Sequence, residues 1–161
     1  MELVTVIIEA PRNNPGKYVY DETGHYYKLK KVLPLGMYFP YDFGLIQDTL
    51  AEDGDPADAM VFTECITYPG IHLSCRIIGA LQAKQPKKGK TIRNDRYFVI
   101  PEDSIAYAHI KEINDFSRKH NQQLQDFFVN YTKAENIKLS HLKFMNSSAA
   151  AKNLKTLMKE E

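Results

Sequence analysis

The segment at residues 52–58, EDGDPAD, carries four acidic side chains within seven positions. Its aspartates, Asp53, Asp55 and Asp58, are spaced so that an extended loop can direct the first two toward one region and return the third to it. Carboxylates this close repel one another, so the segment is either a solvated turn or a cation site. Asp, Gly and Pro all favour turns, whereas a dense set of hard oxygen ligands suits Mg²⁺ or Mn²⁺.

Two features favour the cation site over the solvated turn. Pro56 fixes part of the backbone between the aspartates and so reduces the entropy lost when the loop becomes ordered. The loop also lies between two apolar segments that read as strands, which give it a rigid scaffold. An EF-hand is excluded, because the 12-residue loop and its terminal bidentate Glu are missing.

Magnesium beside clustered carboxylates is typical of phosphate chemistry, which also needs cationic side chains to hold phosphate oxygens. The chain offers five such residues in or beside predicted strands: Lys17, Lys30, Lys31, Arg93 and Arg96. Each lysine taken singly is more simply read as a solvated surface charge. The whole set, alongside the acidic loop, predicts a phosphate-binding side to the site.

The totals describe one globular domain, residues 1–161, of which 43% are hydrophobic. Basic and acidic residues nearly cancel, 21 against 20, so no global basic excess suggests nucleic acid as a partner. Two cysteines are too few for a disulfide framework, and the N-terminus lacks the basic start and long apolar stretch of a signal peptide. No apolar window is long enough to span a membrane. We therefore expect a cytoplasmic protein.

The first hundred residues read as strands and the rest as helices. The predicted extended segments are 3–10, 17–21, 26–33, 37–46, 59–66, 73–83 and 96–101, with turns at 12–16, 23–24 and 85–90. Helical spacing of apolar residues predicts one helix between Asp115 and Tyr131, capped by Asp115 or Ser117, and a second over 146–161, capped by Asn146 or Ser147. This order predicts an α+β fold, a small and mostly antiparallel barrel with two helices packed on it.

Several segments resemble one family in order and spacing. EDGDPADAM is similar to the Asp-x-Asp-Pro-x-Asp signature of the soluble family I inorganic pyrophosphatases. The segments IIEAPRNNPGKYVYD, MYFPYDFGLIQDTL, HIKEINDF and DFFVNY resemble other family segments, from about Val4 to Tyr131. The resemblance implies an OB-like barrel flanked by helices. It also implies Mg²⁺-dependent hydrolysis of pyrophosphate to two phosphates by a metal-activated water.

The resemblance also implies roles for acidic residues that match the family pattern. Asp53 and Asp58 would be metal ligands. Asp55 would be the base, or would orient the metal-bound water that attacks phosphorus. Glu9 would support the site through waters.

The same comparison implies a phosphate-binding set. Lys17 and Tyr131 match the family type and would hold phosphate oxygens. Lys31 stands where the family has Arg, because an ungapped count from Asp21 places it there instead of Lys30, and Arg96 stands where the family has Lys.

The chain also departs from the family pattern, at Val19, Phe39, Phe43, Gly89, Asn94 and Thr132, and Ala57 is smaller than the usual residue. Three of these changes remove acids, at Val19, near Gly89 and at Asn94, so we expect fewer Mg²⁺ ions than the family holds. Asp95 could replace the acid lost at Asn94 only through a bulge, because side chains in a strand alternate. The two Tyr-to-Phe changes each remove a hydroxyl, and a lost hydrogen bond to a charged phosphate costs about 1.5–3 kcal/mol.

Three functions remain open at this point. The first is a divergent, slower pyrophosphatase. The second is a hydrolase of another phosphoanhydride or phosphoester, with Phe39 and Phe43 offering a face to an organic group. The third is an inactive barrel that binds a ligand or nucleic acid, since residues 87–90, KKGK, form a basic edge. A solvated hairpin is the simpler interpretation of that edge. Homo-oligomer formation is left open by the sequence.

Overall fold

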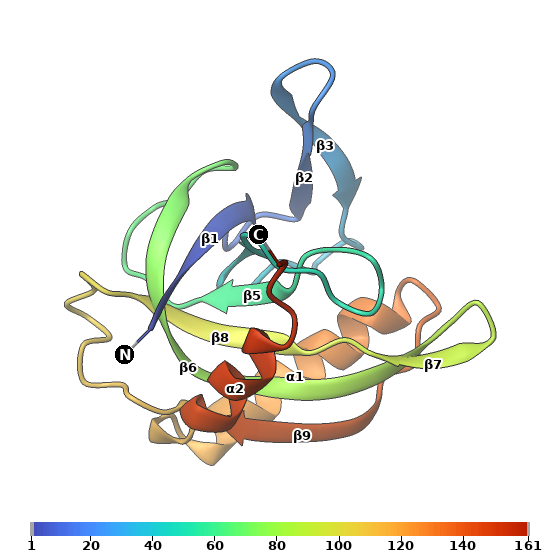
Figure 1. The fold of residues 1–161 in the computed structure, drawn as a ribbon. Helices are drawn as coiled ribbons and strands as arrows, with labels where there is room; N and C mark the ends of the chain where they lie inside the picture. Colours follow the sequence, from blue (N-terminus) through green and yellow to red (C-terminus); the bar gives the residue numbers. More distant parts are fainter. Residues whose placement is uncertain (1, 161) are drawn as a thin grey trace.

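A computed structural model describes residues 2–160 and forms a curled sheet with helices on two sides (Figure 1). The strands are β1 (Leu3–Ala10), β2 (Gly16–Asp21), β3 (Tyr26–Val32), β4 (Asp42–Ile46), β5 (Asp58–Val61), β6 (His72–Lys87), β7 (Lys90–Arg93), β8 (Arg96–Pro101) and β9 (Ser140–Asn146). The helices are the 3₁₀ turn η1 (Ile113–Asp115), α1 (Arg118–Lys133) and α2 (Ser147–Lys155).

The central sheet closes on itself. Its strand order β1-β4-β5-β8-β6 returns to β1, because β1 pairs with both β4 and β6. Every pairing in this ring is antiparallel except β5 with β8, which run parallel. The predicted α+β fold, a mostly antiparallel OB-like barrel with helices packed on it, is confirmed.

The long strand β6 makes this closure, because it pairs with β1, β8, β7 and β9 along its length. Its register against β8 shifts between Ile77 and Gly79. A Cβ atom at Gly79 would lie 2.7 Å from both the Met145 carbonyl oxygen and Ile113 Cγ2. Only glycine allows β9 and η1 to approach β6 this closely. Gly79 therefore marks the bend that lets β6 pair with four other strands.

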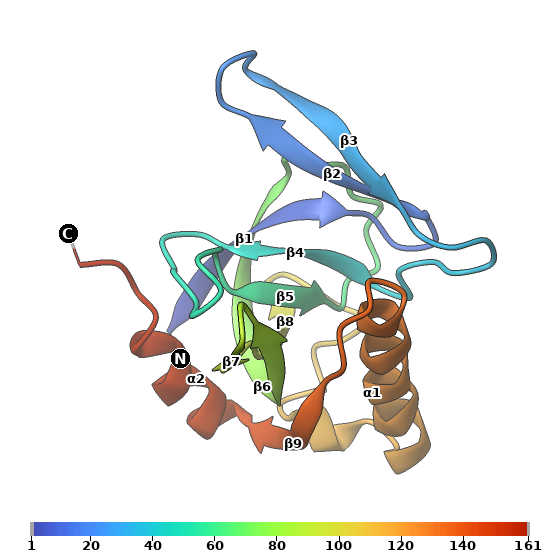
Figure 2. The same cartoon turned by 90° about the vertical axis from the view of Figure 1, so that its right-hand side faces the viewer.

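Two apolar clusters cover the sheet. One gathers phenylalanines from several strands, including Phe43 and Phe98, against Phe128 of α1. The other joins β1, β5 and β8 to Ala150 and Leu154 of α2. Figure 2 shows the helices on different sides of the barrel, with β9 between them and the β2–β3 hairpin projecting away.

Both helices begin where a polar cap was expected. Ser117 caps α1 by accepting a hydrogen bond from the His120 amide, whereas Asp115 belongs to the preceding η1. Asn146 caps α2 by accepting from the Ala149 amide. The described part of the chain contains no helix long and apolar enough to cross a membrane.

The extended segments were predicted less accurately at their ends. Strands β4 and β5 are shorter than the predicted segments 37–46 and 59–66, and β6 is longer than 73–83. The predicted basic turn at 85–90 was too long, because residues 85–87 belong to β6 and Lys90 to β7, so that only Lys88 and Gly89 form the tip of the β6–β7 hairpin. Neither β7 nor β9 was predicted, because both are short and are ordered by pairing with β6.

Candidate active site

All eight residues predicted for the site line one cavity of about 430 Å³, called here the active cavity. They are Glu9, Lys17, Lys31, Asp53, Asp55, Asp58, Arg96 and Tyr131. The barrel strands β1, β5 and β8, the β2–β3 hairpin, helix α1 and the loop before β5 each contribute at least one. Residues up to 122 positions apart in sequence are therefore brought to one place by barrel closure and by α1.

The acidic loop folds back on itself before it enters β5. The Asp55 amide donates to Asp53 Oδ1 at 3.0 Å, and the Ala51 amide donates to the Asp55 carbonyl at 2.8 Å. Gly54 turns the chain with φ +89°, a left-handed conformation that side chains with a Cβ rarely adopt. Asp58 then lies in β5, where it stands opposite Arg96 in the register with the parallel strand β8. The segment is therefore a turn, as one of the two interpretations predicted, and its aspartates also line a cavity.

Positive charge only partly compensates the partly buried carboxylates of the cavity. Burial raises the pKa of Asp58, and the charges of Asp53 and Asp55 raise it further, although Lys17 and Arg96 oppose this. Burial likewise raises the pKa of Glu9, with Lys17 opposing the change from 3.9 Å away. Carboxylates that repel one another in this way would be stabilised as anions by an added cation.

The donor set suits magnesium with partial protein ligation. Within residues 2–160, no three side chains of the His, Cys, Asp and Glu types come together closely enough to hold an ion by themselves. Mg²⁺ commonly keeps several waters and takes only one or two carboxylates together with substrate phosphates. Asp53 and Asp58, which both line an open cavity, meet that requirement.

The opposite side of the cavity is cationic. Lys17 of β2 and Lys31 of β3 are direct cross-strand partners, an arrangement of like charges that is destabilising in the absence of an anion. Lys31 forms an ion pair with Glu135 and lies 4.4 Å from the centre of the Tyr131 ring. Burial raises the pKa of Tyr131 to about 12, so its hydroxyl is a neutral hydrogen-bond donor at physiological pH. Lys30 also lines the cavity but is exposed. Arg93, the remaining cationic candidate, does not line it and borders a separate hollow instead.

The floor of the cavity holds one buried guanidinium among amides. Arg96 is 3% exposed and donates to the Asn94 carbonyl at 2.6 Å and to Gln85 Oε1 at 3.5 Å. The Asn94 side chain donates to Asp53 Oδ2 at 3.2 Å and to Gln85 Oε1 at 3.4 Å. Gln85 was not predicted as a site residue, because only the pairing of β6 with β7 brings it beside Asn94.

A family model described as inorganic pyrophosphatase matches residues 6–161. The chain belongs to the inorganic pyrophosphatase family. It is 38% identical over 136 residues to the inorganic pyrophosphatase of Thermus thermophilus, covering 83% of this chain and 74% of that protein. The corresponding Synechocystis protein is 33% identical over 133 residues, 83% of this chain and 76% of that one. The crystal structure of the T. thermophilus pyrophosphatase has a TM-score of 0.85 at 30% identity and covers 97% of this chain and 89% of that chain.

The resemblance predicts that this site lacks acids that the family has, and the structure shows where the residues at those positions lie. Asn94 lies in the active cavity, whereas Asp95 lines a separate cavity of about 200 Å³ behind it. There Asp95 accepts hydrogen bonds from the Ala83 amide, Arg93 Nε and Asn153 Nδ2 at 2.8–3.2 Å. Asp95 therefore does not replace the lost acid, as the alternation of side chains predicted.

One of the missing acids was expected near Gly89, but the structure does not place Gly89 in the site. Gly89 lies at the tip of the β6–β7 hairpin and does not line the active cavity. The β6 residue that does so is Gln85, four positions earlier.

The two phenylalanines play different parts. Phe43 lines the active cavity, with Lys17 5.3 Å from its ring centre. Phe39 is wholly buried behind it, with stacked rings 5.4 Å apart, and does not reach the cavity. The idea that both rings offer a face to an organic substrate is therefore wrong for Phe39. Thr132 also lines the cavity, whereas the adjacent Lys133 does not.

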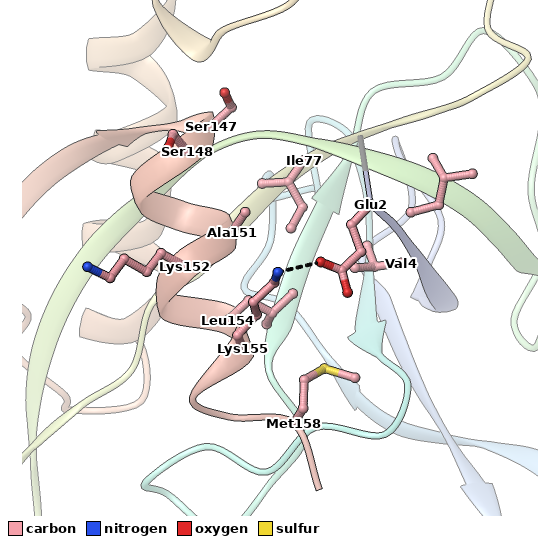
Figure 3. Close-up of a pocket in the computed structure, with 11 residues that line it drawn as sticks. Glu2, Val4, Ile77, Ser147, Ser148, Ala151, Lys152, Leu154, Lys155 and Met158 are labelled. Carbon is pink, nitrogen blue, oxygen red and sulfur yellow. Dashed lines mark ion pairs between the residues drawn. The ribbon is translucent and has the colours of Figure 1, made fainter.

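A second hollow, called here the apolar groove, lies between β1 and α2 and measures about 480 Å³ (Figure 3). Its floor is apolar, with Val4, Ile77 and Leu154 facing one another. An ion pair of 2.9 Å between Glu2 and Lys155 crosses it. Among residues 2–160, Glu2 is the single acid of this lining and is already paired, whereas the active cavity is lined by several acidic and several basic side chains.

Proposed function

We propose that this chain hydrolyses inorganic pyrophosphate to two phosphates in a reaction that depends on Mg²⁺. The observation that carries the proposal is that Asp53, Asp55 and Asp58 line one cavity together with Lys17 and Lys31. Membership of the pyrophosphatase family supports the same reaction. A site for pyrophosphate needs both charges, because the ligand is a polyanion that is bound together with divalent cations.

Asp53 and Asp58 are the residues that would hold the ion. When bound, a divalent ion lowers the pKa of a bound water and withdraws charge from phosphoryl oxygens. Asp55 is the exposed member of the trio and is the base that accepts the proton of the attacking water. Its backbone amide is held by Asp53, so the base and the ligand are positioned by the same turn.

The remaining residues orient the substrate. Lys17 and Lys31 supply charge-assisted hydrogen bonds to phosphate oxygens, and the neutral Tyr131 hydroxyl donates a further one. Each lysine already has a carboxylate neighbour, Glu9 and Glu135 respectively. The substrate therefore competes with these acids for the two lysines.

The site holds fewer ions than the family complement. Asn94 and Gln85 are neutral at the end of the cavity next to Asp53, and Val19 is apolar at its mouth. Each Mg²⁺ ion needs anionic ligands to offset its costly dehydration, so three missing acids reduce the number of ions that bind. We propose one or two ions, held by the acidic loop.

A substrate panel tests the proposed function. Phosphate release is measured from pyrophosphate, tripolyphosphate and ATP at equal Mg²⁺. The proposal predicts that pyrophosphate has the largest kcat/KM. Preference for ATP would favour a different phosphoanhydride hydrolase instead, with the Phe43 and Val19 wall accepting the organic group. Absence of turnover on all three would refute the proposed hydrolase.

A further inference from the structure

The end of the active cavity formed by Gln85, Asn94 and Arg96, called here the amide end, is built differently from the lysine side. Lys17 and Lys31 each have a carboxylate within 4 Å. Arg96 has none at ion-pair distance within the part of the chain that the structure describes. Its direct partners are a backbone carbonyl and an amide oxygen, both neutral. The most deeply buried cation of the cavity therefore has no carboxylate in direct contact, although the charge of Asp58 acts on it from beyond ion-pair distance.

The Arg96 guanidinium is also incompletely hydrogen-bonded. Its Nε atom is buried and has no hydrogen-bond partner. The bond from its Nη2 to Gln85 is long, at 3.5 Å. A buried charge is costly unless it is both paired and hydrogen-bonded. An anion bound in the cavity would supply the missing pairing.

The carboxylate of Asp53, which lines the same cavity, is engaged by other donors. Asp53 accepts from the Asn94 side chain through Oδ2 and from the Asp55 amide through Oδ1, so both of its oxygens are engaged away from Arg96. Gln85 accepts both of its bonds through Oε1, which leaves its Nε2 group able to donate to a ligand. The amide end thus offers a guanidinium and an amide donor with no acid between them.

We propose that Gln85, Asn94 and Arg96 form a phosphate subsite that binds a phosphoryl group directly, without a divalent cation. The inference rests on the proposed function for the identity of the ligand as phosphate. Asn94 acts here as a positioning residue, because it holds Asp53 aside. Arg96 and Gln85 contact the phosphate oxygens. One phosphoryl group of the substrate lies at the amide end, and the other lies toward the ion held by the acidic loop.

The test is binding of orthophosphate in EDTA, followed by ³¹P NMR or calorimetry at low ionic strength. Wild-type protein is compared with a Gln85→Glu/Asn94→Asp double variant, which gives Arg96 carboxylate partners without changing side-chain size. The control is Gln123→Glu/Asn130→Asp, which makes the same charge change on exposed positions of α1. We expect the wild type and the control to bind phosphate in EDTA. The double variant should bind at least about tenfold more weakly.

The double variant should also bind Mn²⁺ more tightly than the wild type, measured by electron paramagnetic resonance without substrate. Equal phosphate binding by the two proteins, or no binding by the wild type in EDTA, would overturn the subsite. Should the double variant lack a folded circular dichroism spectrum, Gln85→Glu alone makes the same test, because one acid suffices to pair with Arg96.

These outcomes separate the subsite from the proposed function. Phosphate binding in EDTA without any pyrophosphate turnover in Mg²⁺ would leave the subsite standing and refute the hydrolase. If the protein turns over pyrophosphate in Mg²⁺ but binds phosphate only when the ion is present, the hydrolase would stand and the metal-free subsite would be refuted.

Discussion

The active cavity and the apolar groove enclose similar volumes, about 430 and 480 Å³, yet only one of them is equipped for chemistry. The groove is lined by β1, β6 and α2, and apart from a few polar side chains its walls are apolar (Figure 3). The cavity draws on strands, a hairpin, a loop and a helix, and it gathers several acidic and several basic side chains. Both hollows bring together elements that are far apart in sequence. The difference teaches that a concentration of charges of both signs identifies the site, whereas volume does not.

The largest effect should come from the base in the acidic loop. Asp55→Asn keeps the size of the side chain but cannot accept the proton of the attacking water, so we expect kcat to fall by about 10²–10⁴-fold. The measurement is the steady-state rate of phosphate release from pyrophosphate. Asp103→Asn, at an exposed position outside the cavity, is the matched control and should keep full activity. A full rate for Asp55→Asn would remove Asp55 from the mechanism.

Tyr131→Phe should have the next largest effect. The change removes one hydroxyl that donates to a charged phosphate, worth about 1.5–3 kcal/mol, and keeps the ring that Lys31 covers. We expect kcat/KM for pyrophosphate to fall by roughly 10–150-fold, with the melting temperature little changed. A variant that melts early and loses activity in proportion would show that Tyr131 has only a packing role.

Asp58 should make the metal-free protein less stable at neutral pH. Burial raises its pKa above the value of 3.8 found for a free side chain, so the folded state binds this proton more tightly than the unfolded state does. Its contribution to stability is therefore fully present below pH 3.8 and is lost as pH rises through the folded pKa. In EDTA at pH 7, Asp58→Asn should melt at a higher temperature than the wild type, and the gap should close in acid.

Added Mg²⁺ should reverse that order, because an ion that binds only the folded wild type stabilises it by mass action. Thermal melts at several Mg²⁺ concentrations make the comparison. If the wild type melts at a higher temperature than Asp58→Asn in EDTA as well, the ionised Asp58 side chain does not destabilise the metal-free protein.

The apolar groove should give the smallest effect. Glu2 and Lys155 form an exposed ion pair, and such pairs contribute about 0–1 kcal/mol. Lys155→Gln should leave pyrophosphate turnover within about twofold of the wild type and change the free energy of unfolding by less than about 1 kcal/mol. Urea denaturation and the phosphate-release assay measure both. A large loss of activity in Lys155→Gln would show that the apolar groove also takes part in catalysis.

Local sequence patterns and the family resemblance together predicted eight of the residues that line the site. The aspartate spacing, the two lysines of the hairpin and Tyr131 on the apolar face of α1 are all local signals, and barrel closure brings them together. Gln85 was missed because its place beside Asn94 depends on hairpin register, which strand pairing determines. The burial of Phe39 was missed for a similar reason, since an aromatic residue near the site can pack behind the cavity wall. Strand β9 depends wholly on its partner β6.

The most direct test of the account is the rate of phosphate release from pyrophosphate by the wild-type chain as Mg²⁺ is varied from an EDTA baseline. The account holds that the acidic loop binds enough Mg²⁺ for catalysis although Asn94 and Gln85 are neutral. It predicts no release in EDTA and a rate that rises to saturation with Mg²⁺. A rate that stays at the level of Asp55→Asn at every Mg²⁺ concentration would contradict it.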